Sequence, residues 1–288
     1  MLKFYNFYIY IVENIANIII VLIYNLNYFF MKSSLPIANK DTINVIGNGP
    51  SLKLDIDKII INNCNDDNLV VNMFAESSNY EILKPSYYLL VDPAYFINDL
   101  KLYDLQINLA NFLINKTTWP INFLVPHSSR NSNFIKKIKT NLNIKIFYIL
   151  NIPIVGGSNI LNSLLFKLKL ANPLYQNVLI AGIFLSLQLR YKNINIWGSD
   201  HSWHEQLSIG NNNEIYINDL HFYDLNRSNV FIHKNFENKN LKLHEIFNTF
   251  SRAFKTYHLL YFYSNKLKIN IYNMCGTSWI DAFNRQSK

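Results

Sequence analysis

Short runs of β-branched and aliphatic residues alternate along this chain with longer runs of helical character. The short runs, which are typical of β-strands, lie at 43–46, 68–74, 87–93, 121–126, 144–150, 193–200 and 268–274. The longer runs, which predict helices, lie at 52–61, 133–142, 177–191 and 241–267. Strands that alternate with helices indicate a mostly parallel sheet. We therefore predict an α/β fold, a Rossmann-like and mostly parallel sheet with helices on both faces.

The first thirty residues form a separate apolar segment. Residues 4–30 are strongly apolar, but polar side chains interrupt them at Glu13, Asn14, Asn17, Asn25 and Asn27. The cleanest apolar run, 15–24, covers ten residues and still includes Asn17, whereas a spanning helix needs ~20 mostly apolar residues. No small-residue cleavage site follows the segment. This pattern favours a helix that lies at a membrane interface or packs on the protein.

Two alternatives for this segment stay open, a single spanning anchor and an ordinary globular helix. Lys32, with Lys40 further on, would hold that end on the cytoplasmic side if the helix spanned a membrane. We predict an N-terminal helix at 1–32 and one catalytic domain at 33–288. The predicted location is the cytoplasm, peripheral on the cytoplasmic face of the inner membrane.

Between 201 and 240 no hydrophobic periodicity survives, and polar residues mix with aromatic ones. A segment of this length without regular structure inside a compact domain is usually a functional lid or is disordered. We predict a lid over 201–240.

Composition narrows the class of partner. The chain has 288 residues, 50% of them hydrophobic, and a formal net charge of +8, which suits an anionic ligand or an anionic membrane surface. Its basic residues are scattered and no nucleic-acid module occurs, so nucleic acid is not predicted as a partner. Cys64 and Cys275 form no metal-spaced pair and indicate a reducing compartment. The abundance of Asn, Tyr and Ile is typical of compositional drift, so local Asn-rich signals carry little weight.

The stretch NVIGNGPSLK, starting at residue 44, concentrates turn residues in a chain with only 8 Gly and 8 Pro. A strand, a glycine turn and a helix together aim backbone amides and the positive helix end at an anion, typically a phosphate. Gly47 and Gly49 allow positive φ and close approach, and Pro50 fits a first helical position. The turn, which ends at Ser51, therefore predicts a phosphate site. An ordinary tight turn is the alternative.

Polar side chains also stand where the predicted strands end. In open α/β sheets, ligands bind outside the carboxyl ends of the strands. The residues at these ends are Asn48, Asn72, Asp92, Ser199, Asp200 and His201. Any one of them could simply close a turn, but the set predicts a nucleotide or sugar pocket.

Several of these motifs resemble a known group of enzymes. VIGNGPSLK, then VNMF and LLVDPAYF, are similar to bacterial lipo-oligosaccharide sialyltransferases that use CMP-sialic acid. They also resemble the wider pterin-pyrophosphokinase-like family, which includes motility-accessory glycosyltransferases. GIFLSLQLRYKNINIWGSDHSW and INIYNMCGTSWIDAF are similar to later segments of both groups. The likeness covers 43–283 in order, and the glycine turn is its most specific part.

The resemblance implies roles for individual residues. By position, Asn48, Asn72 and Asp92 would hold the cytidine nucleotide and its phosphate. The family's serine–glycine pair, which contacts the sialic-acid carboxylate, falls at Gln176 and Asn177, where this chain departs from the pattern.

The resemblance also implies a catalytic histidine just before a long helix. His244 fits that place best, and His221 is the second candidate. The family's tyrosine pair on the lid has no match after Asp200.

Two patterns offer a metal site instead. Asp55-Ile-Asp57 is a D-x-D pair, but it stands early in a predicted helix, where acidic residues complement the helix dipole. His201, His204 and His221 lack a nearby cysteine or a convincing carboxylate. We therefore predict no metal and no cofactor, and CMP leaving as a single phosphate fits metal-independent transfer.

The predicted function is a glycosyltransferase that moves a sugar, sialic acid or a related acidic sugar, from a CMP-linked nucleotide donor to a surface-glycan acceptor. A histidine would act as the general base. Two alternatives stay open: a pyrophosphokinase-type phosphotransferase that uses ATP and magnesium, and a non-catalytic, membrane-docked nucleotide-binding protein. A homo-oligomer is also left open.

Overall fold

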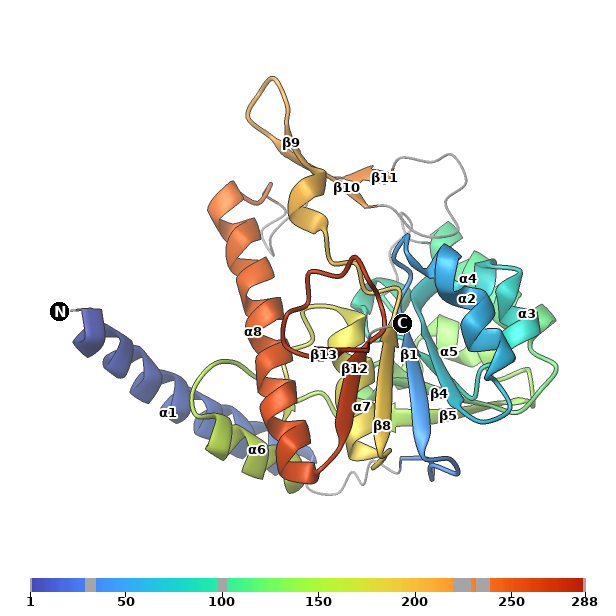
Figure 1. Ribbon diagram of the computed structural model, residues 1–288, viewed down its shortest axis with the longest axis horizontal. Helices are drawn as coiled ribbons and strands as arrows, with labels where there is room; N and C mark the ends of the chain where they lie inside the picture. Colours follow the sequence, from blue (N-terminus) through green and yellow to red (C-terminus); the bar gives the residue numbers. More distant parts are fainter. Residues whose placement is uncertain (1, 29–34, 98–102, 220–228, 232–238, 287–288) are drawn as a thin grey trace.

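The computed structural model describes residues 2–28, 35–97, 103–219, 229–231 and 239–286 (Figure 1). Its centre is an eight-stranded sheet in the order β13-β12-β8-β1-β2-β3-β4-β5, and every neighbouring pair is parallel. The strands are β1 (Thr42–Ile46), β2 (Asp67–Val71), β3 (Tyr87–Leu89), β4 (Ile121–Pro126), β5 (Ile144–Ile149), β8 (Asn193–Trp197), β12 (Asn270–Asn273) and β13 (Asn284–Arg285). The predicted α/β fold is confirmed.

Helices cover both faces of the sheet. One face packs against α2 (Leu52–Ile61), α3 (Asn79–Leu83), α4 (Tyr103–Lys116) and α5 (Asn133–Ile138). The other face packs against α6 (Asn159–Lys167), α7 (Val178–Gln188) and α8 (Leu243–Leu267), with α1 (Leu2–Tyr28) beside α6. The buried helix α7 lies against the middle of the sheet, where a Cβ on Gly182 would lie 2.9 Å from Val45. Because Gly182 has no side chain, α7 can pack closely on the sheet at this position.

The strand order reverses between β1 and β8. From β1 the chain builds β2, β3, β4 and β5 outward on one side, and then returns to place β8 on the other side of β1. The turns that follow β1 and β8 therefore meet at a topological switch point, the usual place for a ligand in an open α/β sheet.

Some predicted boundaries differ from the structure. β2 ends at Val71 rather than at residue 74, because Asn72, with φ +50°, begins a 3-10 helix over Asn72–Glu76. β3 ends at Leu89, and Asp92 caps a 3-10 turn at Pro93–Tyr95. The hydrophobic pattern predicted no element for α3, α4 or α6, because polar residues interrupt the apolar positions of these helices.

The segment 201–240 is not without regular structure, so that expectation was wrong. It contains a 3-10 helix, η5 (Trp203–Gln206), and a small antiparallel sheet of β9 (Leu207–Ile209), β10 (Ile215–Asp219) and β11 (Asn229–Phe231). A two-stranded sheet of β6 (Pro153–Ile154) and β7 (Asn172–Pro173) completes the described strands. The strands of the small sheet are too short to show a period in the sequence.

Asn44, in the central strand β1, connects three strands through its buried side chain. Its Nδ2 donates to Asn68 Oδ1 on β2 at 2.9 Å. Its Oδ1 accepts from Asn195 Nδ2 at 3.2 Å and from Trp197 Nε1 at 3.0 Å, both on β8. Buried polar groups of this kind are costly only when they lose a partner. Although the abundance of Asn is typical of compositional drift, this asparagine is therefore part of the core.

We expect Asn44→Ala to lower the free energy of unfolding by about 3 kcal/mol, because the Trp197 and Asn68 groups would be left buried without a partner. Chemical denaturation followed by circular dichroism measures the change. The matched control is Asn270→Ala, which removes an exposed cross-strand bond to Asn193 of 3.0 Å. The control should change the free energy of unfolding by less than about 0.5 kcal/mol, and equal effects of the two variants would contradict the prediction.

Candidate functional site

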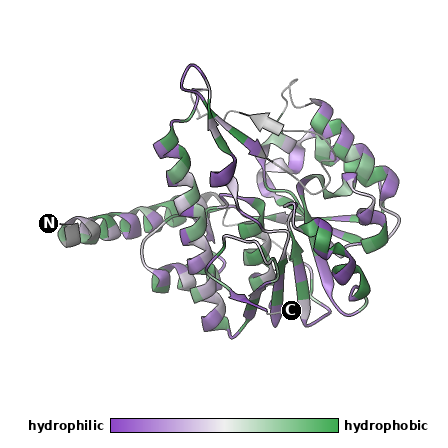
Figure 2. Ribbon diagram, turned by 45° about the horizontal axis from the view of Figure 1, so that its top comes forward, coloured by the Kyte–Doolittle hydropathy of each residue, from purple (hydrophilic) through white to green (hydrophobic). Residues whose placement is uncertain are grey.

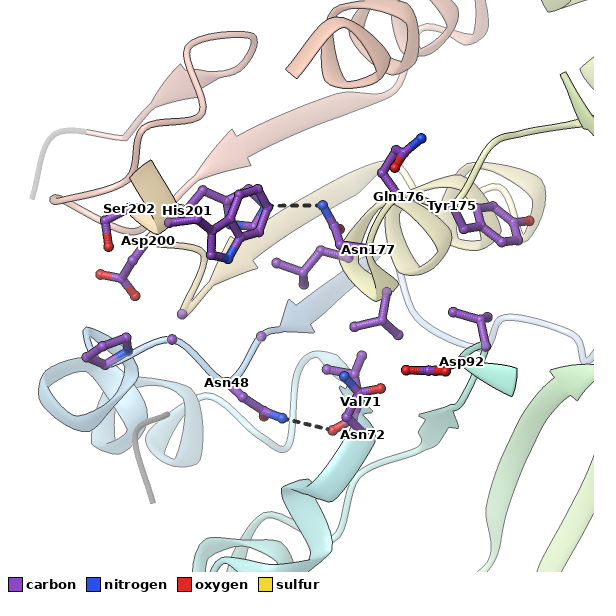
Figure 3. Close-up of a pocket in the computed structure, with 18 of the residues that line it drawn as sticks. Asn48, Val71, Asn72, Asp92, Tyr175, Gln176, Asn177, Asp200, His201 and Ser202 are labelled. Carbon is purple, nitrogen blue, oxygen red and sulfur yellow. Dashed lines mark hydrogen bonds between the residues drawn. The ribbon is translucent and has the colours of Figure 1, made fainter. Parts of the chain in front are cut away.

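A cavity of about 610 Å³ opens at the carboxyl ends of β1, β2, β3 and β8, facing the first turn of α7 (Figure 3). Ten of the residues singled out in the sequence line it: Gly47, Asn48, Gly49, Pro50, Asn72, Asp92, Gln176, Asn177, Asp200 and His201. The fold thus brings together polar side chains from four separate strand ends and one helix start.

Three other predicted site residues, Ser51, Ser199 and His244, do not line the cavity. Ser51 begins α2 just behind the cavity, and Ser199 is fully buried, with its Oγ 3.5 Å from Asn273 Oδ1. His244 is exposed in the first turn of α8 and is not among the lining residues. His221 lies outside the described residues.

The glycine turn after β1 is bonded to the turn after β8. The amide of Gly47 donates to Trp197 O and the amide of Gly49 donates to Gly198 O, each at 2.9 Å. A Cβ on Gly47 would lie 2.5 Å from Gly198 O, and a Cβ on Gly198 would lie 2.6 Å from Gly47 O. Glycine is needed here for the close approach of two backbones. Neither Gly47 nor Gly49 has a positive φ, in contrast to the prediction.

The positive end of α2 is occupied by a carboxylate of the chain itself. Asp200 Oδ2 accepts from the backbone amide of Ser51 at 3.2 Å and from its Oγ at 2.8 Å, while Oδ1 accepts from Thr277 Oγ1 at 2.8 Å. Ser51 is the N-cap, so Pro50 precedes the helix rather than starting it. The amides of Gly47, Gly49 and Ser51 thus already have partners, and an anion in this cavity needs other donors.

Three amide oxygens in the cavity wall have no hydrogen-bond partner within the described part of the chain: Asn48 Oδ1, Asn72 Oδ1 and Gln206 Oε1. Asn48 is 8% exposed, and its Nδ2 donates to Val71 O at 3.3 Å, which fixes the orientation of the amide (Figure 3). The carbonyl of Asn72 accepts from the buried hydroxyl of Tyr88. Because buried polar atoms are nearly always paired, these acceptors indicate a ligand that brings N–H or O–H donors.

The first turn of α7 faces the same cavity. Asn177 is its N-cap and accepts from the amide of Ile180 at 3.1 Å through Oδ1. Gln176, Val178 and Leu179 line the cavity beside it. The first amides of a helix have no partner within the helix, and the helix dipole makes this end positive. This end of α7 therefore favours a negatively charged group.

His201 belongs to a buried network behind this helix end. Its Nε2 lies 2.6 Å from the hydroxyl of Tyr257 on α8 and 3.5 Å from Asn177 Nδ2, and the Tyr257 hydroxyl donates to Asn177 Oδ1 at 3.1 Å. Burial lowers the pKa of His201 to about 3, so its imidazole is neutral at pH 7. Burial also raises the pKa of Tyr257. The network joins the turn after β8 to α7 and α8.

Two residues that contact His201, Tyr257 and Trp203, were not predicted from the sequence. Tyr257 lies in the middle of a long amphipathic helix, where an aromatic residue is usually part of the core. Trp203 packs over His201, with ring centroids 4.2 Å apart, and lines the cavity. Its position two residues after the GSDH stretch was the available signal.

The D-x-D pair lies on α2, outside the cavity lining. Asp55 is buried and its Oδ1 pairs with Lys58 Nζ at 2.8 Å, whereas Asp57 is exposed. Among the residues that the structure describes, no three His, Cys, Asp or Glu side chains gather in a group that could hold a metal ion.

Comparisons with known proteins complete the description. No family model matches the chain, and no curated protein matches its sequence. Among solved structures it is similar to a MAf glycosyltransferase from Magnetospirillum magneticum AMB-1, with a TM-score of 0.49 and 12% sequence identity. The match covers 88% of this chain and 35% of the other, so this chain spans about a third of that protein's length.

Proposed function

We propose that this protein is a glycosyltransferase that uses a nucleotide-sugar donor, with a CMP-linked acidic sugar as the favoured donor and a surface glycan as the acceptor. One observation carries the proposal: the unpaired oxygens of Asn48 and Asn72 face the first turn of α7 in a cavity at the switch point of the sheet. The accepting oxygens on one wall of the cavity suit the donors of a nucleoside, and the positive end of α7 on another wall suits its phosphate. The sequence resemblance supports the same class of donor.

The polar groups suggest how such a donor would lie. The exocyclic amine of a cytosine or the hydroxyls of a ribose would donate to Asn48 and Asn72, which have accepting oxygens to offer. The phosphate would lie at the amides that begin α7, where charge and donors favour an anion. His201 would act as a positioning residue, since its neutral ring supports Asn177 and thereby the helix end.

The reaction then needs a base for the acceptor hydroxyl. The base takes this proton as the acceptor oxygen bonds to the anomeric carbon, the bond from that carbon to the phosphate oxygen breaks, and CMP leaves with the bonding electrons. His221 and His244 remain the candidates. The exposed position of His244 outside the lining favours His221, which follows β10 in the sequence. Metal-independent transfer remains part of the proposal.

Nucleotide binding tests this proposal. We expect CMP to bind the wild type, and we expect Asn48→Ala and Asn72→Ala each to weaken binding about 10- to 100-fold, because a ligand donor would lose its partner on burial. Titration calorimetry gives the affinities. Asn65→Ala, at an exposed turn position beyond the carboxyl end of α2 and outside the cavity lining, is the matched control and should bind CMP as the wild type does.

Three results would count against the proposal. They are no binding of CMP or a CMP-sugar, equal affinity in both cavity variants and the wild type, or binding of ATP only with magnesium. The last would favour the phosphotransferase.

The transfer is also expected to be independent of metal ions. Release of CMP from CMP-sialic acid should therefore persist in EDTA. Activity that is lost in EDTA and restored only by magnesium or manganese would overturn metal-independent transfer.

A further inference from the structure

Four of the polar residues that interrupt the apolar N-terminal segment, Glu13, Asn14, Asn17 and Asn25, are hydrogen-bonded to the protein body. Glu13 accepts from the amide of Gly157 at 2.7 Å, and Asn14 accepts from the amide of Ser158 at 2.9 Å. Asn17 Oδ1 accepts from the amide of Val155 at 3.2 Å, and Asn17 Nδ2 donates to the carbonyl of the same residue at 3.2 Å. The helix α1 is therefore bound to the loop that precedes α6 through directed hydrogen bonds.

This loop is shaped to receive α1. Gly156 and Gly157 have φ values of +62° and +71°, which glycine adopts without strain. A Cβ on Gly156 would lie 2.3 Å from the carboxylate of Glu13, and a Cβ on Gly157 would lie 3.0 Å from Asn14 Oδ1. Loop and helix fit each other, so α1 is part of the folded body over this stretch.

The opposite side of α1 is apolar and exposed. Seen along the helix, its outward residues follow the i, i+3, i+4 spacing of one face: Phe4, Tyr8, Ile11, Ile15, Ile18, Ile19, Leu22 and Ile23. From Phe4 to Ile23 this face is about 28 Å long. Figure 2 shows the N-terminal part of α1 extending past the rest of the molecule. The helix therefore presents polar groups to the protein and apolar groups to the outside.

Helix α6 lies beside α1 and carries an exposed apolar stripe of its own. Asn14 is bonded to Ser158, and Asn25 Nδ2 donates to Leu170 O at 3.1 Å, so α1 and α6 run parallel and side by side. The exposed residues Ile160, Leu164 and Leu168 form an i, i+4, i+8 stripe, with exposed fractions of 67%, 51% and 56%. Lys167 and Lys169 are exposed beside this stripe. We call these outward residues of the two helices the α1–α6 face.

We propose that the α1–α6 face docks the protein on the surface of an anionic lipid bilayer, with α1 lying in the plane of the interface rather than across the membrane. This inference does not depend on the proposed function. An apolar face about five helical turns long supplies the hydrophobic contact, and the two lysines suit anionic head groups. The single acidic residue in α1, Glu13, is turned inward, so a second copy of this face would offer these lysines no partner.

The contacts between α1 and the body also distinguish a helix that lies in the membrane interface from one that spans the membrane. By length and composition alone, Phe7–Asn25 could cross a membrane. However, the helix is bonded to the body at positions from Glu13 to Asn25, and the longest part of α1 outside these contacts is residues 2–12. Eleven helical residues reach about 16 Å, whereas the hydrocarbon core is ~30 Å thick. While α1 is bound to the body, it is too short to span.

Vesicle flotation of the full chain tests this proposal. We expect the protein to float with vesicles of phosphatidylcholine and phosphatidylglycerol and to bind pure phosphatidylcholine more weakly. The double variant Leu164→Glu/Leu168→Glu on α6 and the double variant Ile15→Glu/Ile19→Glu on α1 should each weaken binding by about tenfold or more. Leu142→Glu, at a residue 98% exposed in the turn between α5 and β5, is the matched control and should float as the wild type does. All variants change exposed side chains, and thermal unfolding verifies that each is folded.

A cross-link tests whether α1 binds lipid while it stays on the body. Asn14→Cys/Ser158→Cys in a Cys64→Ser background would be joined by a short bis-maleimide, since the other cysteine, Cys275, is buried. The cross-linked protein should float as well as the unlinked one. Loss of flotation on cross-linking would overturn the in-plane arrangement, and full binding of the α6 variant would overturn the role of α6. A wild type that ignores vesicles but forms a dimer through this face would overturn the choice of a membrane.

Discussion

Replacing Gly198 by alanine should lower the free energy of unfolding by about 3 kcal/mol or more. The residue has a φ of +57°, which costs a non-glycine residue about 1–2 kcal/mol. Its Cβ would also lie 2.6 Å from Gly47 O and 3.0 Å from Leu52 Cβ, and overpacking of this kind typically costs a further 1–3 kcal/mol. Chemical denaturation gives the change. Gly47→Ala, whose Cβ meets Gly198 O at 2.5 Å, should show the same sign.

The chain supplies its own control for this prediction. A Cβ on Gly276 meets nothing within 4 Å, so Gly276→Ala should leave the free energy of unfolding within about 0.5 kcal/mol of the wild type. If Gly198→Ala were as stable as Gly276→Ala, the close junction of the two turns would be wrong. The same geometry applies to Gly49, whose Cβ would lie 2.7 Å from Gly198 O. Variants at these glycines would change both the stability of the fold and the binding of a ligand. Asn48 and Asn72 are therefore better probes of the cavity.

His221→Ala should lower the rate of sugar transfer by about 100- to 10,000-fold with little change in CMP affinity, as expected for loss of a general base. His244→Ala should retain most of the turnover, because His244 is exposed and does not line the cavity. Rates from CMP release and affinities from calorimetry separate catalysis from binding. His258→Ala is the control variant, because His258 is exposed and its Nε2 lies 3.0 Å from Asp281 Oδ1.

The opposite result has a clear meaning. If His244→Ala lost turnover while His221→Ala kept it, the base would stand at the start of α8, and that helix end would have to approach the cavity during the reaction. If neither variant changed the rate, the proton would go to another group, and the assignment of a histidine base would fail.

The strand ends could be predicted from the sequence because their signals are local. A β-branched run followed by Asn or Asp indicates where a parallel strand stops, and such ends lie on one edge of the sheet. This reasoning selected Asn48 and Asn72, which do line one cavity. It could not select Tyr257, which reaches His201 from a helix 56 residues later in the chain.

The role of the glycine turn shows the limit of local reasoning. Strand, glycine turn and helix together predict an anion at the end of α2, and nothing in that stretch indicates that the place is taken. Asp200, 149 residues further along, fills it with a carboxylate. The helix dipole acts on any nearby negative charge, whether it comes from a ligand or from the chain. Only long-range folding decides which one is present.

By itself, the sequence determined the α/β class, the positions of the main strands and the apolar character of the N-terminal segment, because hydrophobic periodicity and turn residues act over a few neighbours. Only the tertiary structure decided which amides of the cavity are free and which are paired. It likewise decided that Glu13, Asn14 and Asn17 face the body while the isoleucines of α1 face outward. The physical reason is the same in both cases. A polar group that is removed from water must find a partner, and its partner here comes from a distant part of the chain.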